Sequence, residues 1–437
     1  MRFIVIFAAL ASSAAAQDLP RALTDADFHP VDRAEAELGQ LLFYDPILSG
    51  NRDVSCATCH HPAFGTSDGL SLGMGDGGKG LGPDRVADPA NLPEQRIPRN
   101  SPALFNLGAR EFTVLFHDGR IEVDQTRPGG LRTPLADDMV TGFASLLSAQ
   151  TMFPVLSGDE MAGHYSENDV SQAVRRGMIT GPGGAWDIIS RRVADIPAYA
   201  DAFIAVYDHI DDPAQIGFTD ISNAIAAFME LEWRSDNAPF DAVLRGEASL
   251  PAPAAAGMAL FYGEAGCSSC HAGPFLTDHQ FHAMGVPQIG PGKAERFESH
   301  ASDLGRFRVT GDAADMFAFR TPSLRNVALT GPYGHSGAYA DLRAFLVAHL
   351  DPVTALDSYD LDQALLPDLA VDDGRGLADS PAIAAAVSLD PVSLDDAGLD
   401  ALLAFLDSLT DPNAKTGVLG IPDTVPSGLS VARVPEG

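Results

Sequence analysis

The residues best suited to chemistry are the four cysteines, which form two motifs of one pattern. The motifs are C-A-T-C-H at residues 56–60 and C-S-S-C-H at residues 267–271. In C-x-x-C-H, two thiols can add to the vinyl groups of a haem while the adjacent imidazole binds its iron. A redox disulfide or a zinc ion is the alternative, but the motifs lie too far apart for the ligand spacing of a zinc finger. The pattern predicts two covalent c-type haems, held by Cys56, Cys59 and His60 and by Cys267, Cys270 and His271.

The sequence around the two motifs is repeated. Four pairs of segments occur in the same order: G-Q-L-L-F-Y (39–44) and G-M-A-L-F-Y (257–262), F-G-T-S-D (64–68) and F-L-T-D (275–278), P-A-L-F-N (102–106) and P-S-L-R-N (322–326), and H-D-G (117–119) and H-S-G (335–337). One such pair would be weak evidence, but four in one order indicate an internal duplication. We therefore expect one haem-binding unit, used twice with different insertions.

The elements that must position these motifs are predicted to be mainly helical. Apolar residues recur at helical spacing in residues 220–233 and 394–409, and residues 341–350 form a short helix that ends before Pro352. Strand signals are sparse. Loops are indicated by Gly- and Pro-rich stretches at residues 73–102, 125–134 and 285–293. The expected fold class is mainly α, with two small helical haem domains and long loops around the cofactors.

Charge and composition limit the partners. Asp and Glu number 59 against 28 Lys and Arg, which gives a formal net charge of −31. Such a surface repels nucleic acid and anionic membranes, and it favours cationic partners. Hydrophobic residues make up 46% of the chain, which excludes an intrinsically disordered protein.

The N-terminus has the features of a secretory signal peptide. Arg2 supplies a positive charge, Phe3 to Leu10 is apolar but too short to span a bilayer, and Ala14-Ala15-Ala16 offers a cleavage site. We expect residues 1–16 to be a cleavable signal peptide. The mature protein is then exported to the periplasm without a membrane span.

Taken together, these segments resemble the bacterial dihaem cytochrome c peroxidase superfamily, which includes the dihaem enzyme that matures the cofactor of methylamine dehydrogenase. The resemblance runs from about Gly39 to about His349 and is most specific in L-S-G-N-R-D-V-S-C-A-T-C-H, R-N-S-P-A-L-F-N, H-D-G-R and F-R-T-P-S-L-R-N-V-A-L-T-G-P-Y-G-H-S-G. It implies two cytochrome-c-like domains with calcium between them. We expect an N-terminal peroxidatic domain at 17–170, a C-terminal electron-transfer domain at 171–350, and an acidic extension at 351–437 packed on the second domain.

The resemblance also implies the site residues. Gln150, Pro154 and Glu160 match the spacing of the family's peroxide pocket, where a carboxylate can move protons between the peroxide oxygens and an amide can orient them. In isolation, Gln150 and Glu160 would be read as surface residues. The calcium ligands implied are the Asn100 side chain and the backbone carbonyls of Thr330 and Pro332.

Three departures from the family pattern are expected to matter. His349 stands where the peroxidases have a Met ligand to the second haem. It lies on an apolar stripe with Leu342, Phe345 and Leu346, where a core residue or helix cap is the alternative. We expect His271 and His349 to bind the second iron together.

The second departure concerns the first haem, and the third concerns the region between the haems. No His occurs between His61 and His117, so the His that blocks this haem in many relatives has no counterpart, and we expect His60 to carry an open haem. Met74, in the glycine-rich segment, is interpreted as packing rather than as a ligand. His117 replaces the family's Trp between the haems. His117 and its repeat His335 are expected to contact a propionate or to lie between the haems.

Three functions are weighed. The first is a peroxidase that reduces hydrogen peroxide to water with electrons from a small cytochrome c or cupredoxin. The second is an oxidase that uses peroxide to modify a partner protein, which His349 and the missing blocking His favour. The third is a dihaem electron-transfer protein without catalysis, against which Gln150 and Glu160 argue. A homodimer is left open.

Overall fold

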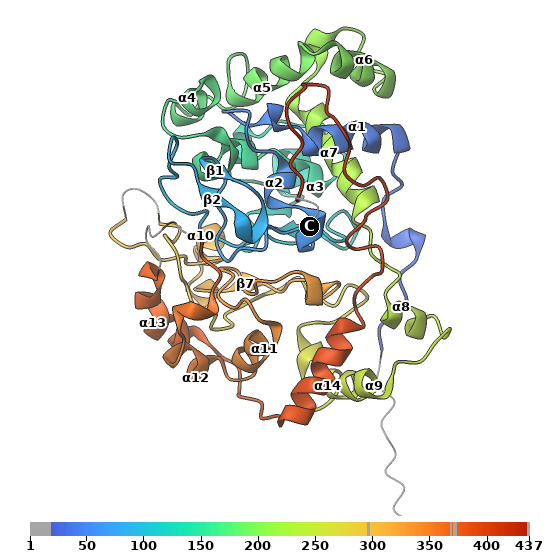
Figure 1. Cartoon of the computed structure of the whole chain (residues 1–437), viewed down its shortest axis with the longest axis vertical. Helices are drawn as coiled ribbons and strands as arrows, with labels where there is room; N and C mark the ends of the chain where they lie inside the picture. The colour runs from blue at the N-terminus through green and yellow to red at the C-terminus, as the bar shows by residue number, and fades with distance from the viewer. Residues whose placement is uncertain (1–18, 295–297, 368, 370–373, 435–437) are drawn as a thin grey trace, which may run out of the picture.

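The structure is a computed structural model that describes residues 19–294, 298–367, 369 and 374–434 (Figure 1). The signal peptide predicted at residues 1–16 lies outside the described residues. Among the described residues, no helix combines the length and apolar character needed to cross a bilayer.

Helices dominate, as the sequence predicts. They are α1 (Arg33–Tyr44), α2 (Cys56–Cys59), α3 (Leu146–Thr151), α4 (Asp169–Arg175), α5 (Ala185–Ala194), α6 (Pro197–Val206), α7 (Phe218–Glu232), α8 (Pro239–Leu244), α9 (Ala252–Phe261), α10 (Phe307–Thr310), α11 (Leu342–Leu350), α12 (Pro352–Asp357), α13 (Ser380–Ala386) and α14 (Asp396–Asp407). Long loops connect them.

The described strands are short and antiparallel. They are β1 (Gly78–Lys79) with β2 (Val86–Ala87), then β3 (Val114–Leu115), β4 (Ile121–Val123) and β5 (Leu131–Arg132) in one sheet, and β6 (Phe281–His282) with β7 (Phe319–Arg320). In the last pair, Phe281 is opposite Arg320 and His282 is opposite Phe319. These small sheets fix the loops around the sites rather than forming a layer of the fold.

Each half of the chain is built on one close helix pair, α1 with α7 and α9 with α14. A Cβ at Gly39 would overlap the backbone carbonyl of Ala224, and a Cβ at Gly257 would overlap that of Ala401. Only glycine allows the two backbones to approach this closely. The glycines that open the repeated G-Q-L-L-F-Y and G-M-A-L-F-Y segments are therefore contact points. The structural repeat therefore also includes α7 and α14, whose sequences are not obviously similar.

The backbone repeats as well. Four pairs of equivalent residues have positive φ in both halves, and most of these residues are not glycine: Thr66 and Leu276, Asn106 and Asn326, Phe116 and Gly334, and Gly119 and Gly337. Positive φ is uncommon outside glycine, so matched occurrences indicate one local geometry used twice. This supports the duplication that the sequence predicts.

The hydrophobic cores divide the chain differently from the expected domains. The first core runs from Leu23 through Trp233 and includes α5, α6 and α7, so it continues past residue 170. The second core joins Phe240, Phe261 and Phe405. The extension was expected to pack on the second domain. Its helix α14 does so, because it lies in the second core and fills the place that α7 fills in the first half.

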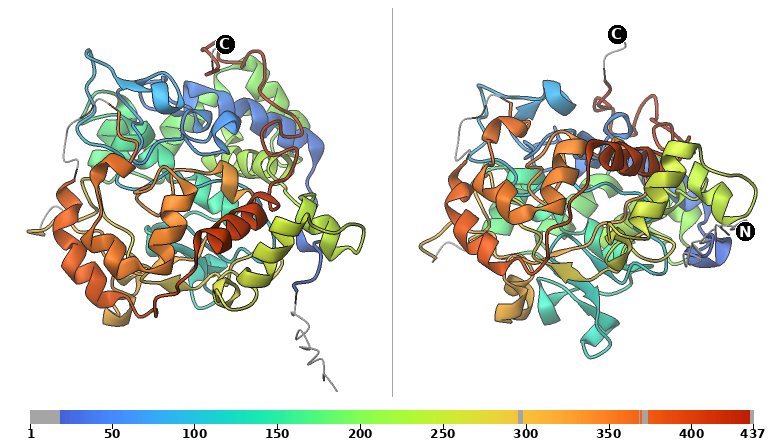
Figure 2. Two further views of the ribbon diagram at one scale, coloured as in Figure 1. Left: turned by 60° about the horizontal axis from the view of Figure 1, so that its bottom comes forward. Right: turned by 90° about the horizontal axis from the view of Figure 1, so that it is seen from below.

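The chain then returns to the first half after α14 (Figure 1 and Figure 2). The Glu232 carboxylate accepts hydrogen bonds from the backbone N–H groups of Val418, Leu419 and Gly420, at 2.8, 2.5 and 2.8 Å. The Ser427 hydroxyl donates to Asp45 at 2.6 Å. The expectation that the whole extension packs on the second half is corrected for these residues.

Candidate active site

The first motif is held in a single helical turn. Ser55 precedes α2, and its backbone N–H donates to the Thr58 hydroxyl at 3.0 Å. His60 follows directly, and its Nδ1 lies 3.0 Å from the carbonyl oxygen of Thr66. Because the carbonyl can only accept, Nδ1 carries the proton and Nε2 is left for a metal. Burial lowers the pKa of His60, which keeps the imidazole neutral as a metal ligand must be.

The second motif repeats this arrangement. His271 Nδ1 lies 3.2 Å from the carbonyl oxygen of Leu276, the residue equivalent to Thr66. The flanking segments match too. The Ser67 hydroxyl donates to the Ser101 carbonyl at 2.7 Å, and the Thr277 hydroxyl donates to the Thr321 carbonyl at 2.7 Å. All four cysteines are free thiols, so the structure forms no disulfide between them.

A cavity of about 460 Å³ lies beside the second motif and reaches into the junction of the two halves. Its lining includes Cys267, Cys270 and His271 from the motif and His349 from α11. The ring centres of His271 and His349 are 6.3 Å apart. Burial, with the neighbouring imidazole of His271, lowers the pKa of His349 to about 4.

These residues fit a haem. One metal ion bound by two imidazoles at about 2 Å each, with roughly 1 Å from each nitrogen to its ring centre, separates the ring centres by about 6 Å. The two thiols needed for covalent attachment face the same cavity. Most of its other lining is apolar, which suits a porphyrin. The fit includes His349, which sequence position alone left open as a core residue.

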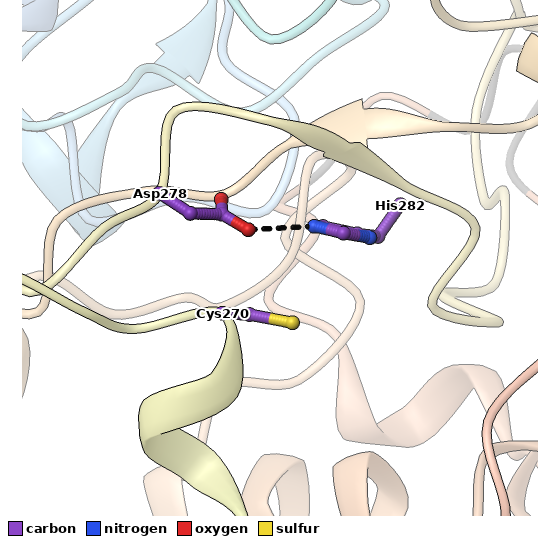
Figure 3. Close-up of side chains that lie close together, drawn as sticks. All are labelled: Cys270, Asp278 and His282. Atoms are coloured by element: carbon purple, nitrogen blue, oxygen red, sulfur yellow. Dashed lines mark hydrogen bonds and ion pairs between the residues drawn. The ribbon is translucent and has the colours of Figure 1, made fainter.

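A different metal reading exists at the same place. Cys270, Asp278 and His282 bring one ligand atom each within 4.8 Å of one another, and Asp278 and His282 face each other at 2.9 Å (Figure 3). A structural zinc ion needs four ligands, and the described residues supply three. Cys270 is also one of the two thiols of the haem motif. The cluster is therefore best read as part of the haem-binding wall.

The three residues expected at the peroxide pocket lie on consecutive turns. Gln150 is in α3, and its Oε1 is buried without a hydrogen-bond partner while the residue lines the cavity. Pro154 begins the 3₁₀ turn Pro154–Leu156, and Glu160 lies in the π-helical turn Gly158–Ala162. Neither of these two is among the cavity's described lining residues. A single π-helical turn is a common feature of functional sites.

The environment of Glu160 is suited to proton transfer. Burial raises the pKa of its carboxyl, while the positive charges of Arg120 and Lys293 and a hydrogen bond from Ser157 oppose the rise. Lys293 comes from the second half of the chain, so both halves supply charge to this carboxyl. Sequence reasoning assigned no role to Arg120, although it ends the H-D-G-R segment, or to Lys293, which belongs to no motif.

The glycine-rich segment after the first motif is fixed in place. The Arg85 guanidinium donates to the carbonyls of Met74, Gly75 and Gly80, at 2.5, 2.6 and 2.7 Å. The backbone N–H of Asp76 donates to the Glu160 carbonyl at 2.9 Å. Met74 is only 1% exposed. This loop thus packs on the Glu160 turn, and Met74 lies outside the described lining of the cavity.

The residues expected to bind calcium share the cavity wall at the junction of the halves. Asn100, Thr330 and Pro332 all line it. The Asn100 amide nitrogen donates to the carbonyls of Leu70 and Ser71, at 2.8 and 3.3 Å. Its Oδ1 is therefore oriented away from these carbonyls and remains an oxygen ligand of the kind that calcium takes.

His117 and His335 occupy equivalent positions on the same wall. His117 Nε2 donates to the Asn100 carbonyl at 3.1 Å. Both ring nitrogens of His335 are buried without a partner, and its ring stacks on Phe319 at 3.6 Å. Because buried polar groups normally have a hydrogen-bond partner, the His335 imidazole is available to bind a ligand in the cavity.

The structure also contains a buried ionic cluster that sequence reasoning missed. Arg99 binds Asp303 through Nε at 2.6 Å and Nη2 at 2.8 Å, and it binds Asp118 through Nη1 at 2.7 Å. The positive charge of Arg99 lowers the pKa of both carboxyls despite their burial. Asp118 belongs to the repeated H-D-G segment, which was the available signal. The cluster joins the two halves.

Comparison with known proteins identifies the family of this chain. Residues 33–249 match the model of a family described as di-haem cytochrome c peroxidase. Over 330 residues, the chain is 31% identical to the methylamine utilization protein MauG of Methylorubrum extorquens, spanning 75% of this chain and 71% of that protein. It is 29% identical over 358 residues to the cytochrome c551 peroxidase of Pseudomonas aeruginosa, spanning 82% and 81%.

A solved structure supports the same relationship. A MauG-like protein associated with microbial copper homeostasis aligns with a TM-score of 0.55 and 26% identity, over 93% of this chain and 97% of that chain. The helical fold with two attachment motifs defines a c-type cytochrome with two haems. The chain belongs to the di-haem cytochrome c peroxidase family. Membership implies haem c as the cofactor of both motifs.

Proposed function

We propose that the protein is a periplasmic dihaem peroxidase that reduces hydrogen peroxide to water with electrons from a small cytochrome c or cupredoxin. The observation that carries the proposal is the buried, unpartnered Oε1 of Gln150, in a chain of this family that also has Glu160 on the adjoining turns. An amide oxygen without a partner is costly in an interior, and a bound substrate or water would satisfy it.

Peroxide reduction consumes two electrons and two protons and yields two waters. The haem on His60, when bound, supplies the iron at which the O–O bond breaks. Glu160 takes a proton from one oxygen and returns it to the other, and burial places its pKa above that of an exposed carboxyl, closer to working pH. Gln150 orients the substrate through its amide. The Glu160 turn and the loop held by Arg85 keep these groups in place.

The remaining assignments complete the proposal. Cys56, Cys59 and His60 hold the first haem. Cys267, Cys270, His271 and His349 hold the second, which receives electrons. Asn100, Thr330 and Pro332 bind calcium at the junction of two units that meet between α7 and α8. The acidic surface attracts a cationic electron donor, and residues 1–16 direct export.

One observation favours a second function, an oxidase that uses peroxide to modify a partner protein. The 6.3 Å separation of the His271 and His349 rings fits ligation of the second haem by two imidazoles. Imidazole in place of a thioether lowers the reduction potential of a haem. A low potential suits the storage of oxidising equivalents better than the acceptance of electrons from a high-potential cytochrome.

Steady-state kinetics with peroxide and a reduced small cytochrome c separate these functions. The proposed peroxidase oxidises the donor with two equivalents per peroxide. An oxidase acts slowly on the donor and forms a long-lived oxidised state when peroxide is added without it. A protein whose spectrum does not respond to peroxide at all would contradict both functions and support simple electron transfer.

A further inference from the structure

Arg320 is a half-buried cation that has no carboxylate partner among the described residues and lines the cavity. Its Nε donates to the Phe116 carbonyl and its Nη1 to the Thr321 carbonyl, both at 3.3 Å. No carboxylate of the described residues forms an ion pair with it. Burial alone lowers the pKa of this guanidinium to about 10. A guanidinium has five N–H donors, so two long bonds leave most of its capacity unused.

Two other arginines, both buried, pair with carboxylates, whereas the buried Arg85 is held by three backbone carbonyls. Arg325 binds both oxygens of Asp241 at 2.8 and 2.9 Å, and Arg99 binds Asp303 and Asp118 as described. A cation shielded from water is costly unless an anion or hydrogen-bond acceptors compensate its charge. The difference between Arg320 and these two residues therefore indicates that its counter-ion is not part of the polypeptide.

The position of Arg320 indicates where that counter-ion lies. Arg320 ends β7 and lines the same cavity as Cys267, Cys270 and His271. By the internal repeat, R-T-P at 320–322 is equivalent to N-S-P at 100–102. The backbone confirms the equivalence, because Asn100 N–H donates to the His335 carbonyl at 2.9 Å and Arg320 N–H donates to the His117 carbonyl at 2.8 Å. The two positions face each other's half of the molecule.

We propose that Arg320 binds a propionate carboxylate of the second haem and thereby helps to set the reduction potential of that haem. The assignment rests on the proposed placement of this haem on His271. Guanidinium and carboxylate form strong paired hydrogen bonds when shielded from water. Asn100 would hold an external cation at the equivalent position of the first unit, whereas Arg320 supplies a built-in one. A fixed positive charge favours the reduced haem, which has one positive charge fewer.

The test measures the potentials of both haems by spectroelectrochemistry in the haem-loaded protein and in R320Q. The reduction equilibrium of the second haem should move about tenfold towards the oxidised form, which is about 59 mV for one electron. The potential of the first haem should change less. R343Q is the matched control. Arg343 is in α11 with His349, but it lies outside the cavity lining and pairs with the exposed Asp396 and Asp400. It should leave the potential unchanged.

An unchanged potential of the second haem in R320Q overturns the proposal. A free anion on Arg320 is distinguished by adding acetate or phosphate: if the wild-type potential moves with the added anion while R320Q does not respond, the partner is an exchangeable anion and not the propionate. If R320Q cannot be isolated with two haems, R320K decides. The propionate bending band in its resonance Raman spectrum should shift, and an unshifted band overturns the assignment. Loss of haem from His271 in the wild type would instead contradict the proposed haem placement.

Discussion

Glu160 combines burial, which disfavours its charge, with nearby cations from both halves, which favour it. The net effect raises the pKa of this carboxyl above that of an exposed Glu. Its raised pKa has a consequence for pH dependence. The base form is lost as the pH falls through that pKa, so the acidic limit of activity should lie at a higher pH than for an exposed Glu.

Glu160→Gln should lower kcat for peroxide reduction by about 10²- to 10⁴-fold, because a positioned proton-transfer group contributes that much. It should also abolish the acidic limb of the pH profile. Asp159→Asn is the control on the same turn, since Asp159 is bound by Gln95 at 2.7 Å and is assigned no proton transfer. Equal losses of kcat in the two variants would contradict the role given to Glu160.

His349→Ala should convert the second haem from low spin to high spin, because it removes one of two imidazole ligands. Electron paramagnetic resonance of the ferric protein reports this directly. His282→Ala is the control, since His282 lines the same cavity but pairs with Asp278. A bis-imidazole spectrum that survives in His349→Ala would remove His349 from the ligand set.

At this scale, the sequence predicts the residues that belong to a motif. The C-x-x-C-H groups were identified from pattern alone, and Gln150, Glu160 and His349 from their position within a resemblance. Arg99 and Asp303 could not be, because they are 204 residues apart and no local pattern joins them. The roles of three other residues likewise depend on their neighbours in the fold and could not be assigned from the sequence: Arg120, Lys293 and Arg320.

The structural element used twice is the helix pair crossed at a glycine. The sequence predicted α7 and α14 as helices from their apolar spacing, and it marked α1 and α9 only through their repeated segments. It could not predict that α7 and α14 are equivalent, because the contact needs only a small residue, Ala224 or Ala401, and an aromatic residue one turn later. Such a requirement leaves little trace in a single sequence.

Gly257→Val should destabilise the second half by about 3 kcal/mol, because its Cβ would enter the backbone of α14. Urea unfolding monitored by far-UV circular dichroism measures this change in the free energy of unfolding. Gly398→Ala is the matched control in the same pair. A Cβ there makes ordinary contacts of 3.4 Å or more, so the helix should gain up to about 1 kcal/mol. Equal destabilisation in both variants would exclude the close crossing as the cause.

The loop that Arg85 fixes against the Glu160 turn leads to another prediction. Residues 62–116 contain no His. We therefore expect that no histidine ligand has to dissociate from the first haem before peroxide binds. The fully oxidised protein should react with peroxide as fast as the half-reduced protein in stopped-flow experiments. Arg85→Met should slow this reaction without loss of haem, because three loop carbonyls lose their donor. An oxidised protein that is inert until half-reduced would refute the prediction.

The net charge of −31 acts at the scale of the whole molecule. Attraction between oppositely charged proteins speeds their encounter and is screened by salt, with a Debye length of about 8 Å at 0.15 M ionic strength. With a basic cytochrome c as donor, kcat/KM should fall steeply as salt is raised. An acidic cytochrome of similar potential should show the opposite trend. The same salt dependence for both donors would argue against electrostatic attraction as the cause.

The sequence predicted two haem units, but it misplaced their limits. The boundary expected at residue 170 followed the end of the peroxide-site motif, whereas packing continues to Trp233 because α5 and α6 cover the α1–α7 pair. The apolar spacing of residues 394–409 predicted a helix that packs on the second half, and α14 does complete the second core. The return of residues 418–427 to the first half left no such pattern in the sequence.

The return of the chain to its own beginning has a consequence for biosynthesis. Glu232 and Asp45 receive partners from residues 418–427, which are synthesised after the helices of both halves. The portion made earliest therefore finishes its packing last. A premature stop codon shortly after α14 would therefore leave the packing of the C-terminal half intact and destabilise the N-terminal half.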